Sequence, residues 1–144
     1  MRALLISTLF GVALLSGCAA TTFPSAGDSP FCTQAGGSRE WQADLLFGRD
    51  IKGHGPVTDA ERAAFLADVV TPRFPDGLTY WDTHGQWRDR ATGAITKEDS
   101  FVIRIAAADT PATLAHLAEI RHAYTERFHQ ESVGLLLSPI CASF

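Results

Sequence analysis

The chain has little positive charge, few cysteines and no second long apolar run. Only 12 of its 144 residues are Lys or Arg, against 16 Asp or Glu, so the net charge is −4 at pH 7. Neutralising nucleic-acid phosphates takes a basic stripe, so a nucleic-acid partner is not expected. After residue 17 no stretch is long and apolar enough to span a bilayer. Internal repeats and low-complexity tracts are absent too, and this length suits one domain with one core.

Signatures of nucleophilic catalysis, phosphate binding and metal binding are absent as well. Ser132 lacks the glycine-flanked turn of a hydrolase nucleophile. The glycine-rich loop at residues 48–56 matches neither a P-loop nor a dinucleotide fingerprint, so we interpret it as a surface loop rather than an anion site. His122 and His129 lack metal-ligand spacing, and His122 with Glu126 indicates an exposed helix pair. We therefore predict no metal, no cofactor and no catalytic residue.

What the chain does have is an N-terminus typical of a bacterial lipoprotein. Arg2 gives a positive start, residues 3–15 are almost wholly apolar but too short to span a bilayer, and Leu15-Ser16-Gly17-Cys18 matches a lipobox. Cys18 is the predicted lipid attachment site; the alternative is an ordinary secretory signal with a chance cysteine. Ala19 is not Asp, which favours sorting to the outer membrane, facing the periplasm. The lipid is then the sole membrane contact.

These signals divide the chain into three parts. Residues 1–17 are the predicted signal peptide, residues 18–30 a lipidated flexible tether, and residues 31–144 a single α+β domain. Cleavage before Cys18 would leave 127 residues with 11 basic and 16 acidic side chains, hence a net charge of −5.

The hydrophobic pattern predicts the order strand, helix, strand, strand, helix, strand. The predicted strands cover residues 41–47, 78–87, 95–107 and 133–137. Thr58, in a capping box with Glu61, begins the first helix, and Thr110 followed by a proline begins the second. Pro72 ends the first helix and Pro139 ends the last strand. The order is that of a ferredoxin-like βαββαβ fold, a four-stranded antiparallel sheet with both helices on one face.

One residue stripe should bury the second helix against the sheet. Its predicted members recur with helical periodicity: Leu114, Leu117, Ile120, Tyr124 and Phe128.

Cys32 and Cys141 occupy positions that this fold brings together. The first and last strands are antiparallel neighbours, so the chain before the first meets the chain after the last. In an oxidising compartment an even pair of cysteines predicts a disulfide, here closing a loop of 109 residues; two free thiols are the alternative.

The sheet face away from the helices is where we expect function. Asp44, Glu98 and Arg104 are predicted to lie on it. The pattern does not fix the register of the second strand, but the matching parity adds Tyr80, Asp82, His84 and Gln86. Carboxylates and a histidine on a rigid sheet suit acid–base chemistry, whereas a solvated face with ion pairs such as Asp44–Arg104 is the simpler interpretation. The candidate ligand-binding residues are Arg73, Asp82, His84, Gln86, Glu98 and Arg104.

Several segments resemble a family of small exported bacterial proteins. They are Trp41 with Phe47-Gly48, residues 71–79 (Thr-Pro-Arg-Phe-Pro-Asp-Gly-Leu-Thr), Gly85-Gln86-Trp87, Glu98, and Tyr124 with residues 128–133 (Phe-His-Gln-Glu-Ser-Val). The family is domain of unknown function three-five-seven-four. The resemblance covers about residues 41–137, implies one exported domain, and brings no activity or catalytic residue. His84 lies where the family motif is not expected to fix a residue, which counts against it as a catalytic base.

Three hypotheses about function follow. The leading one is a non-enzymatic, lipid-anchored periplasmic module that binds a small molecule or an envelope protein. The second is a small envelope enzyme in which Glu98 works with Asp82 or His84, which requires these side chains to converge in a concave pocket. The third is a homodimer, paired sheet to sheet or through the edge strand at residues 78–87. The sequence names neither the ligand nor the oligomeric state. Arg73 has three open roles: capping the preceding helix, binding an anion, or pairing with Asp76.

Overall fold

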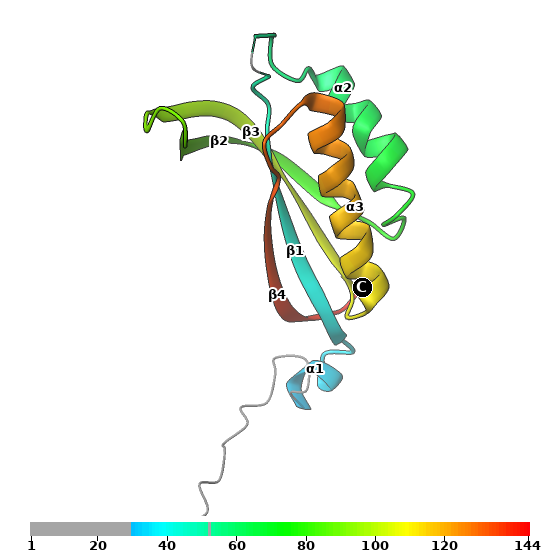
Figure 1. The fold of residues 1–144 in the computed structure, drawn as a ribbon. Helices are drawn as coiled ribbons and strands as arrows, with labels where there is room; N and C mark the ends of the chain where they lie inside the picture. Colours follow the sequence, from blue (N-terminus) through cyan, green and yellow to red (C-terminus); the bar gives the residue numbers. More distant parts are fainter. Residues whose placement is uncertain (1–29, 52) are drawn as a thin grey trace, which may run out of the picture.

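The computed structural model describes residues 30–51 and 53–144. The predicted signal peptide, the predicted lipid site at Cys18 and the tether up to residue 29 lie outside this part. The elements are α1 (Pro30–Gln34), β1 (Ser38–Gly48), α2 (Asp59–Phe65), the π-helical turn η2 (Leu66–Val70), β2 (Thr79–Arg88), β3 (Ile95–Ala108), α3 (Pro111–Phe128) and β4 (Gly134–Ala142) (Figure 1). No helix among the described residues has the length and apolarity needed to cross a bilayer.

The four strands form one antiparallel sheet in the order β2-β3-β1-β4. Helices α2 and α3 lie on the same face of the sheet and leave the other face open (Figure 1). The predicted α+β, ferredoxin-like fold is therefore confirmed. Strands β2 and β4 are the two edges, and β1 lies between β3 and β4.

Local signals in the sequence begin the helices where they were predicted. The Thr58 hydroxyl accepts the N–H of Glu61, whose carboxylate accepts the N–H of Thr58, so the capping box is complete. Thr110 likewise accepts the N–H of Thr113 at 3.2 Å. At its C-terminal end α2 loosens into η2, where the N–H of Thr71 reaches the carbonyl of Leu66 just before Pro72.

An aromatic cluster fills the core between the helices and the sheet. Phe47 and Phe101 stack at 4.7 Å between ring centroids, and Tyr124 meets Phe47 edge-on at 4.7 Å. All three rings are fully buried, and burial of each such side chain contributes about 1.5–3 kcal/mol. The Tyr124 hydroxyl donates a 2.8 Å hydrogen bond to the carbonyl of Gly48, so the core fixes the last residue of β1.

Two predicted details are wrong. Leu114 is 43% exposed, and Thr113 takes its place in the buried stripe of α3, its hydroxyl donating to the carbonyl of Ala108 at 2.7 Å. Strand β4 does not end at Pro139 but continues to Ala142, with Pro139 opposite Trp41. An edge strand tolerates proline because one of its sides has no ladder partner.

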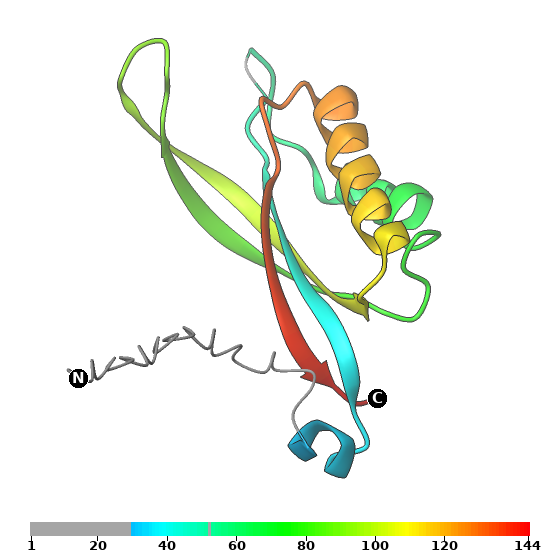
Figure 2. The same ribbon diagram turned by 60° about the horizontal axis from the view of Figure 1, so that its bottom comes forward.

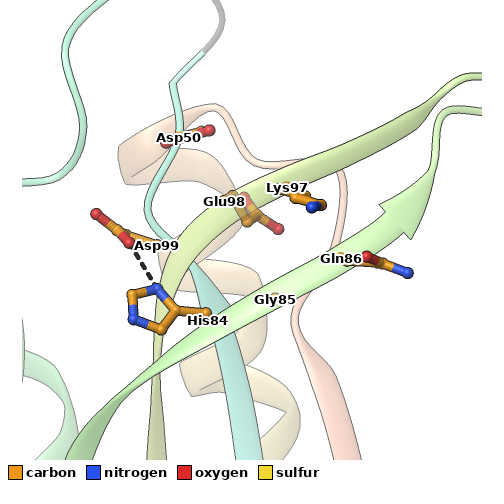
Figure 3. Close-up of a pocket in the computed structure, with 7 residues that line it drawn as sticks. All are labelled: Asp50, His84, Gly85, Gln86, Lys97, Glu98 and Asp99. Carbon is orange, nitrogen blue, oxygen red and sulfur yellow. Dashed lines mark hydrogen bonds and ion pairs between the residues drawn. The ribbon is translucent and has the colours of Figure 1, made fainter.

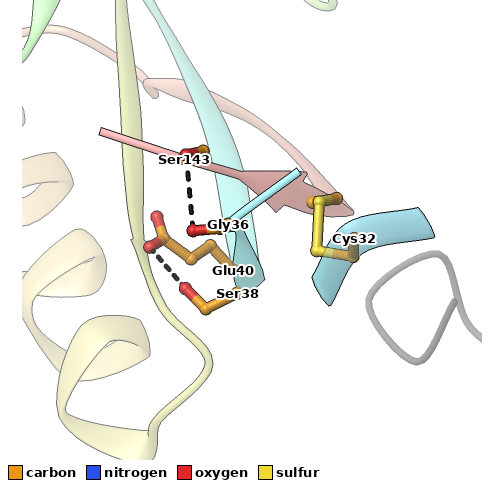
Figure 4. Close-up of a disulfide and its surroundings, with 6 residues drawn as sticks. Cys32, Gly36, Ser38, Glu40 and Ser143 are labelled. Carbon is orange, nitrogen blue, oxygen red and sulfur yellow. Dashed lines mark hydrogen bonds between the residues drawn. A yellow bond between two sulfur atoms is a disulfide. The ribbon is translucent and has the colours of Figure 1, made fainter. Parts of the chain in front are cut away.

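The disulfide between Cys32 and Cys141 is present, with 5.6 Å between the Cα atoms (Figure 4). Cys32 lies in α1, a short helix that the sequence did not predict, and is almost fully buried. Gly37 allows the close approach, because a Cβ there would lie 2.8 Å from the sulfur of Cys141. The bridge fixes α1 against the end of the sheet where β1 begins and β4 ends.

The β2–β3 hairpin extends past the rest of the sheet. Pairing between β1 and β3 stops at Gly48 and Ser100, whereas β2 and β3 stay paired out to Arg88 and Ile95. Residues 84–99 therefore form a two-stranded ribbon, called the arm below, that projects beyond the sheet (Figure 2).

Candidate functional site

The register of β2 differs from the one that the sequence analysis assumed. Gly85 lies opposite Glu98, and Trp81 lies opposite Val102. Directly opposite residues share a face of the sheet, so Trp81, rather than its neighbours in sequence, faces the open side. The prediction that Tyr80, Asp82, His84 and Gln86 share the open face with Glu98 is wrong. A one-residue slip in register reverses every side chain, and the mixed polar pattern of β2 did not exclude it.

Asp82 works instead on the helix-covered side. It forms an ion pair with Arg62 of α2, which also contacts Asp59 at 3.2 Å. The Arg62 side chain is only 11% exposed, and its guanidinium lies over the rings of Tyr80 and Phe101. These contacts join α2 to the hairpin, which makes Asp82 a structural residue.

Glu98 lies on the open face in a position that two glycines make possible. A Cβ at Gly48 would stand 2.6 Å from one carboxylate oxygen of Glu98 and 2.8 Å from the other. A Cβ at Gly85 would lie 3.6 Å from the Cγ of Glu98. The side chain therefore lies across the end of β1 and accepts a hydrogen bond from the backbone N–H of Asp50. These four residues are called the Glu98 site below.

The electrostatics of the Glu98 site favour a protonated carboxyl. Burial raises the pKa of Glu98 above its usual value, the negative charge of Asp50 raises it further, and the hydrogen bond from Asp50 opposes both. The carboxylate is thus incompletely compensated by its surroundings.

A shallow hollow of about 490 Å³ opens beside Glu98 at the base of the arm (Figure 3). Its lining residues come from the end of β1 and from both strands of the arm: Asp50, His84, Gly85, Gln86, Lys97, Glu98 and Asp99. His84 is 91% exposed and its Nδ1 lies 2.9 Å from Asp99. Three carboxylates against one lysine and a histidine make the hollow acidic.

The hollow unites only half of the predicted ligand-binding residues. Glu98, His84 and Gln86 line it, whereas Asp82, Arg73 and Arg104 lie elsewhere. Asp50 and Lys97 were missed. Asp50 follows β1 in a loop, so only the fold, not a sequence pattern, brings it to Glu98.

Arg104 takes part in the cross-strand ion pair that the sequence suggested. It donates two hydrogen bonds to Asp44, at 2.8 and 2.7 Å, and its guanidinium lies over the ring of Trp81. The hydrogen bonds from Arg104 lower the pKa of Asp44, and the carboxylate raises the pKa of Arg104 in turn. Trp81, Leu46 and Leu136 give the open face exposed apolar surface that the sequence analysis did not anticipate.

Arg73 caps the end of the first helical segment. It donates to the carbonyl of Val69 at 2.7 Å and pairs with Glu119 of α3 at 2.8 Å. Of the roles left open by the sequence, capping is therefore the one observed, and Glu119 rather than Asp76 is its acidic partner.

Within residues 30–51 and 53–144, no group of three or more His, Cys, Asp or Glu side chains is placed to hold a metal ion.

Comparison with known proteins identifies a family and a fold. The model of the family described as "Protein of unknown function (DUF3574)" matches residues 42–144, which spans nearly all of the motifs that resemble it. No curated protein sequence matches the chain.

Solved structures with a similar fold include two of a phage SAM lyase. The complex with S-methyl-5'-thioadenosine has a TM-score of 0.60 at 14% identity, over 87% of this chain and 92% of that chain. The apo state has a TM-score of 0.55 at 18% identity, over 75% and 86%. CutA from Synechococcus elongatus has a TM-score of 0.45 at 11% identity, over 74% and 87%.

Proposed function

We propose that this chain, which belongs to the DUF3574 family, is a lipid-anchored protein of the bacterial cell envelope whose domain binds a ligand in the hollow at Glu98. The observation that carries the binding role is the Glu98 site itself. Two glycines and a backbone N–H hold a carboxylate at the edge of a hollow, although burial and a second negative charge disfavour its ionisation there.

The charges of the hollow indicate what kind of group it takes. A half-buried carboxylate gains most from a partner that is positive or rich in hydrogen-bond donors. Asp50 and Asp99 add further acceptors, and Lys97 with the His84 imidazole is too little to neutralise them. An ammonium, a guanidinium or an amide-rich group therefore fits the hollow better than an anion does.

The envelope location rests on the N-terminal sequence. A positive start, a short apolar run and the lipobox ending at Cys18 together specify lipid attachment, and Ala19 favours the outer membrane. The disulfide suits an oxidising compartment.

The fold separates the attachment point from the hollow. The tether meets the domain at α1, beside Ser38, whereas Glu98 lies against Gly48 at the other end of β1 (Figure 1). Eleven extended residues span roughly 33 Å at about 3.3 Å per residue. The hollow is therefore at the end of the domain that is remote from the lipid.

Ligand binding is tested by thermal unfolding of the full chain in detergent. The panel holds amines, guanidinium compounds, amino sugars and cell-wall peptides, with neutral sugars and organic anions as contrasts. A ligand at a hundredfold its Kd adds about 2.7 kcal/mol to the unfolding free energy. The shift should persist in Glu40→Gln, which alters a carboxylate at the far end of the same face, and vanish in Glu98→Gln. Equal shifts in both variants, or none in the native chain, would refute the binding site.

The anchor is tested separately, by labelling with palmitate in a bacterium with two membranes. The native chain should take up label and fractionate with the outer membrane, and Cys18→Ser should take up none. The double variant Cys32→Ser, Cys141→Ser is the control, because it removes the same kind of side chain without touching the lipobox. Label that survives Cys18→Ser would contradict the anchor.

A second candidate function, a small envelope enzyme, is favoured by the raised pKa of Glu98, since a carboxyl that stays protonated can serve as a general acid. Asp82 and His84 share no face with Glu98, so the acid–base pair first expected does not assemble. The fold likeness to the phage lyase provides a specific trial: incubation with SAM, followed by assay for S-methyl-5'-thioadenosine. Turnover that falls in Glu98→Gln but not in Glu40→Gln would replace the binding proposal with an enzyme.

A further inference from the structure

The arm has two open edges. Beyond Ser100 strand β3 has lost its β1 partner, and β2 is an edge strand along its whole length. A two-stranded ribbon on its own is only marginally stable in water, so an arm of this length gains from a third strand.

The outer edge of β2 lacks the usual protection against pairing. Strands on sheet edges are commonly short or interrupted by proline or lysine. The other edge, β4, contains Pro139, whereas the ten residues of β2 include neither proline nor lysine. Ten residues also exceed the typical strand length of about 5–6.

The charges along β2 complement each other in one antiparallel register. If Gly85 of one copy lies opposite Gly85 of another, Asp82 lies opposite Arg88 of the other copy, twice by symmetry. Opposite charges on directly facing residues favour pairing. Asp82 keeps its contact with Arg62 and is still 68% exposed, so its carboxylate remains open to a second partner.

We propose that two copies of this chain pair antiparallel along β2, about a two-fold axis at Gly85, and join their sheets into one of eight strands. The axis is perpendicular to the sheet, so the helices of both copies cover the same side. The proposal is independent of ligand binding and of the lipid anchor.

The pairing also brings the two hollows together. In the Gly85 register His84 of one copy lies opposite Gln86 of the other, and both residues line the hollow. Each hollow is then bordered by the partner's β2, and the two Glu98 sites lie on either side of the axis.

The mass of the full chain in detergent, from light scattering corrected for bound detergent, tests the dimer. We expect the mass of two chains. Arg88→Glu sets like charges opposite Asp82 at two positions and should weaken association about tenfold. Arg90→Glu makes the same charge change in the turn at residues 89–94 and should leave the dimer intact. A single-chain mass, a trimer, or equal behaviour of the two variants would overturn the proposal.

Cross-linking tests the register without relying on the stability of Arg88→Glu. Two differently tagged copies of the full chain are co-expressed, one with His84→Cys and the other with Gln86→Cys. Facing residues lie about 4.5–5.5 Å apart between Cα atoms, within the range of a disulfide. A mixed disulfide should form, whereas two copies of Gln86→Cys should link much less, because their positions are two residues out of register. The reverse pattern would exclude pairing about Gly85.

Discussion

Replacing Gly48 with alanine should displace the Glu98 side chain without unfolding the domain. The new Cβ would lie 2.6 Å from one carboxylate oxygen, roughly 1 Å inside an ordinary contact of about 3.5 Å. The obstructing atoms are the end of a flexible side chain, so Glu98 can rotate into solvent at little cost. Gly48 has no positive φ, so its backbone accepts alanine without strain.

The magnitudes separate stability from the Glu98 site. Alanine restricts the unfolded chain and stabilises by about 0.4–1 kcal/mol where the native backbone allows it. A raised pKa means that ionisation of Glu98 costs folding free energy, and this cost grows as pH rises from about 4.5 through the folded-state pKa. Displacing the carboxylate removes the cost. Gly48→Ala should therefore be as stable as the native chain or more so near neutral pH, while the pKa of Glu98 falls towards 4.5.

Carboxyl NMR titration and denaturant unfolding at several pH values measure both quantities. Gly55→Ala is the matched control, because a Cβ there meets nothing within 4 Å and the φ is not positive. Ligand-induced stabilisation should be lost in Gly48→Ala and kept in Gly55→Ala. An unchanged Glu98 pKa, or a loss of more than about 2 kcal/mol, would mean that β1 moves instead of the carboxylate, and the reasoning would fail.

Three further predictions concern the frame around the site. Replacing Cys32 and Cys141 with alanine opens a loop of 109 residues and should lower the unfolding free energy by about 4.7 kcal/mol, read from urea unfolding. Asp44→Asn should cost about 1 kcal/mol or less at neutral pH, since Arg104 is half exposed. Because the folded-state pKa of Asp44 is lowered, this difference should shrink as pH falls below about 3.8, and a constant difference would contradict the ion pair. Thr58→Ala should cost about 1 kcal/mol by removing the cap, whereas Thr58→Ser should restore most of it.

The sequence predicted the fold because its local and global signals agree. Thr58 and Thr110 begin helices, alternation reveals the strands, and the positions of Cys32 and Cys141 suit only neighbouring first and last strands. The errors occur where a residue's role depends on a distant segment. Pro139 is tolerated in β4 because that strand is an edge, which composition does not reveal.

The site was predicted less well for the same reason. Asp82 looks like a surface acid until Arg62 approaches it from α2. In β2 the polar residues alternate with residues that are themselves partly polar, so the pattern did not decide which set faces the helices. A usable signal was present in Trp81 and Trp87, whose size marks the set that lies against the open face, together with the glycine between them that accommodates Glu98.

Strand β1 connects the features that matter for the proposed function. Its first residues are held by the disulfide beside α1, and its last residue is held by the hydroxyl of Tyr124, which donates to the carbonyl of Gly48. Burial raises the pKa of Tyr124, so this hydroxyl remains a donor at any physiological pH. The position of the Glu98 carboxylate against Gly48 is thereby set by the core and not by the mobile surface. A ligand site built in this way is organised before its ligand arrives, and this preorganisation reduces the entropy lost on binding.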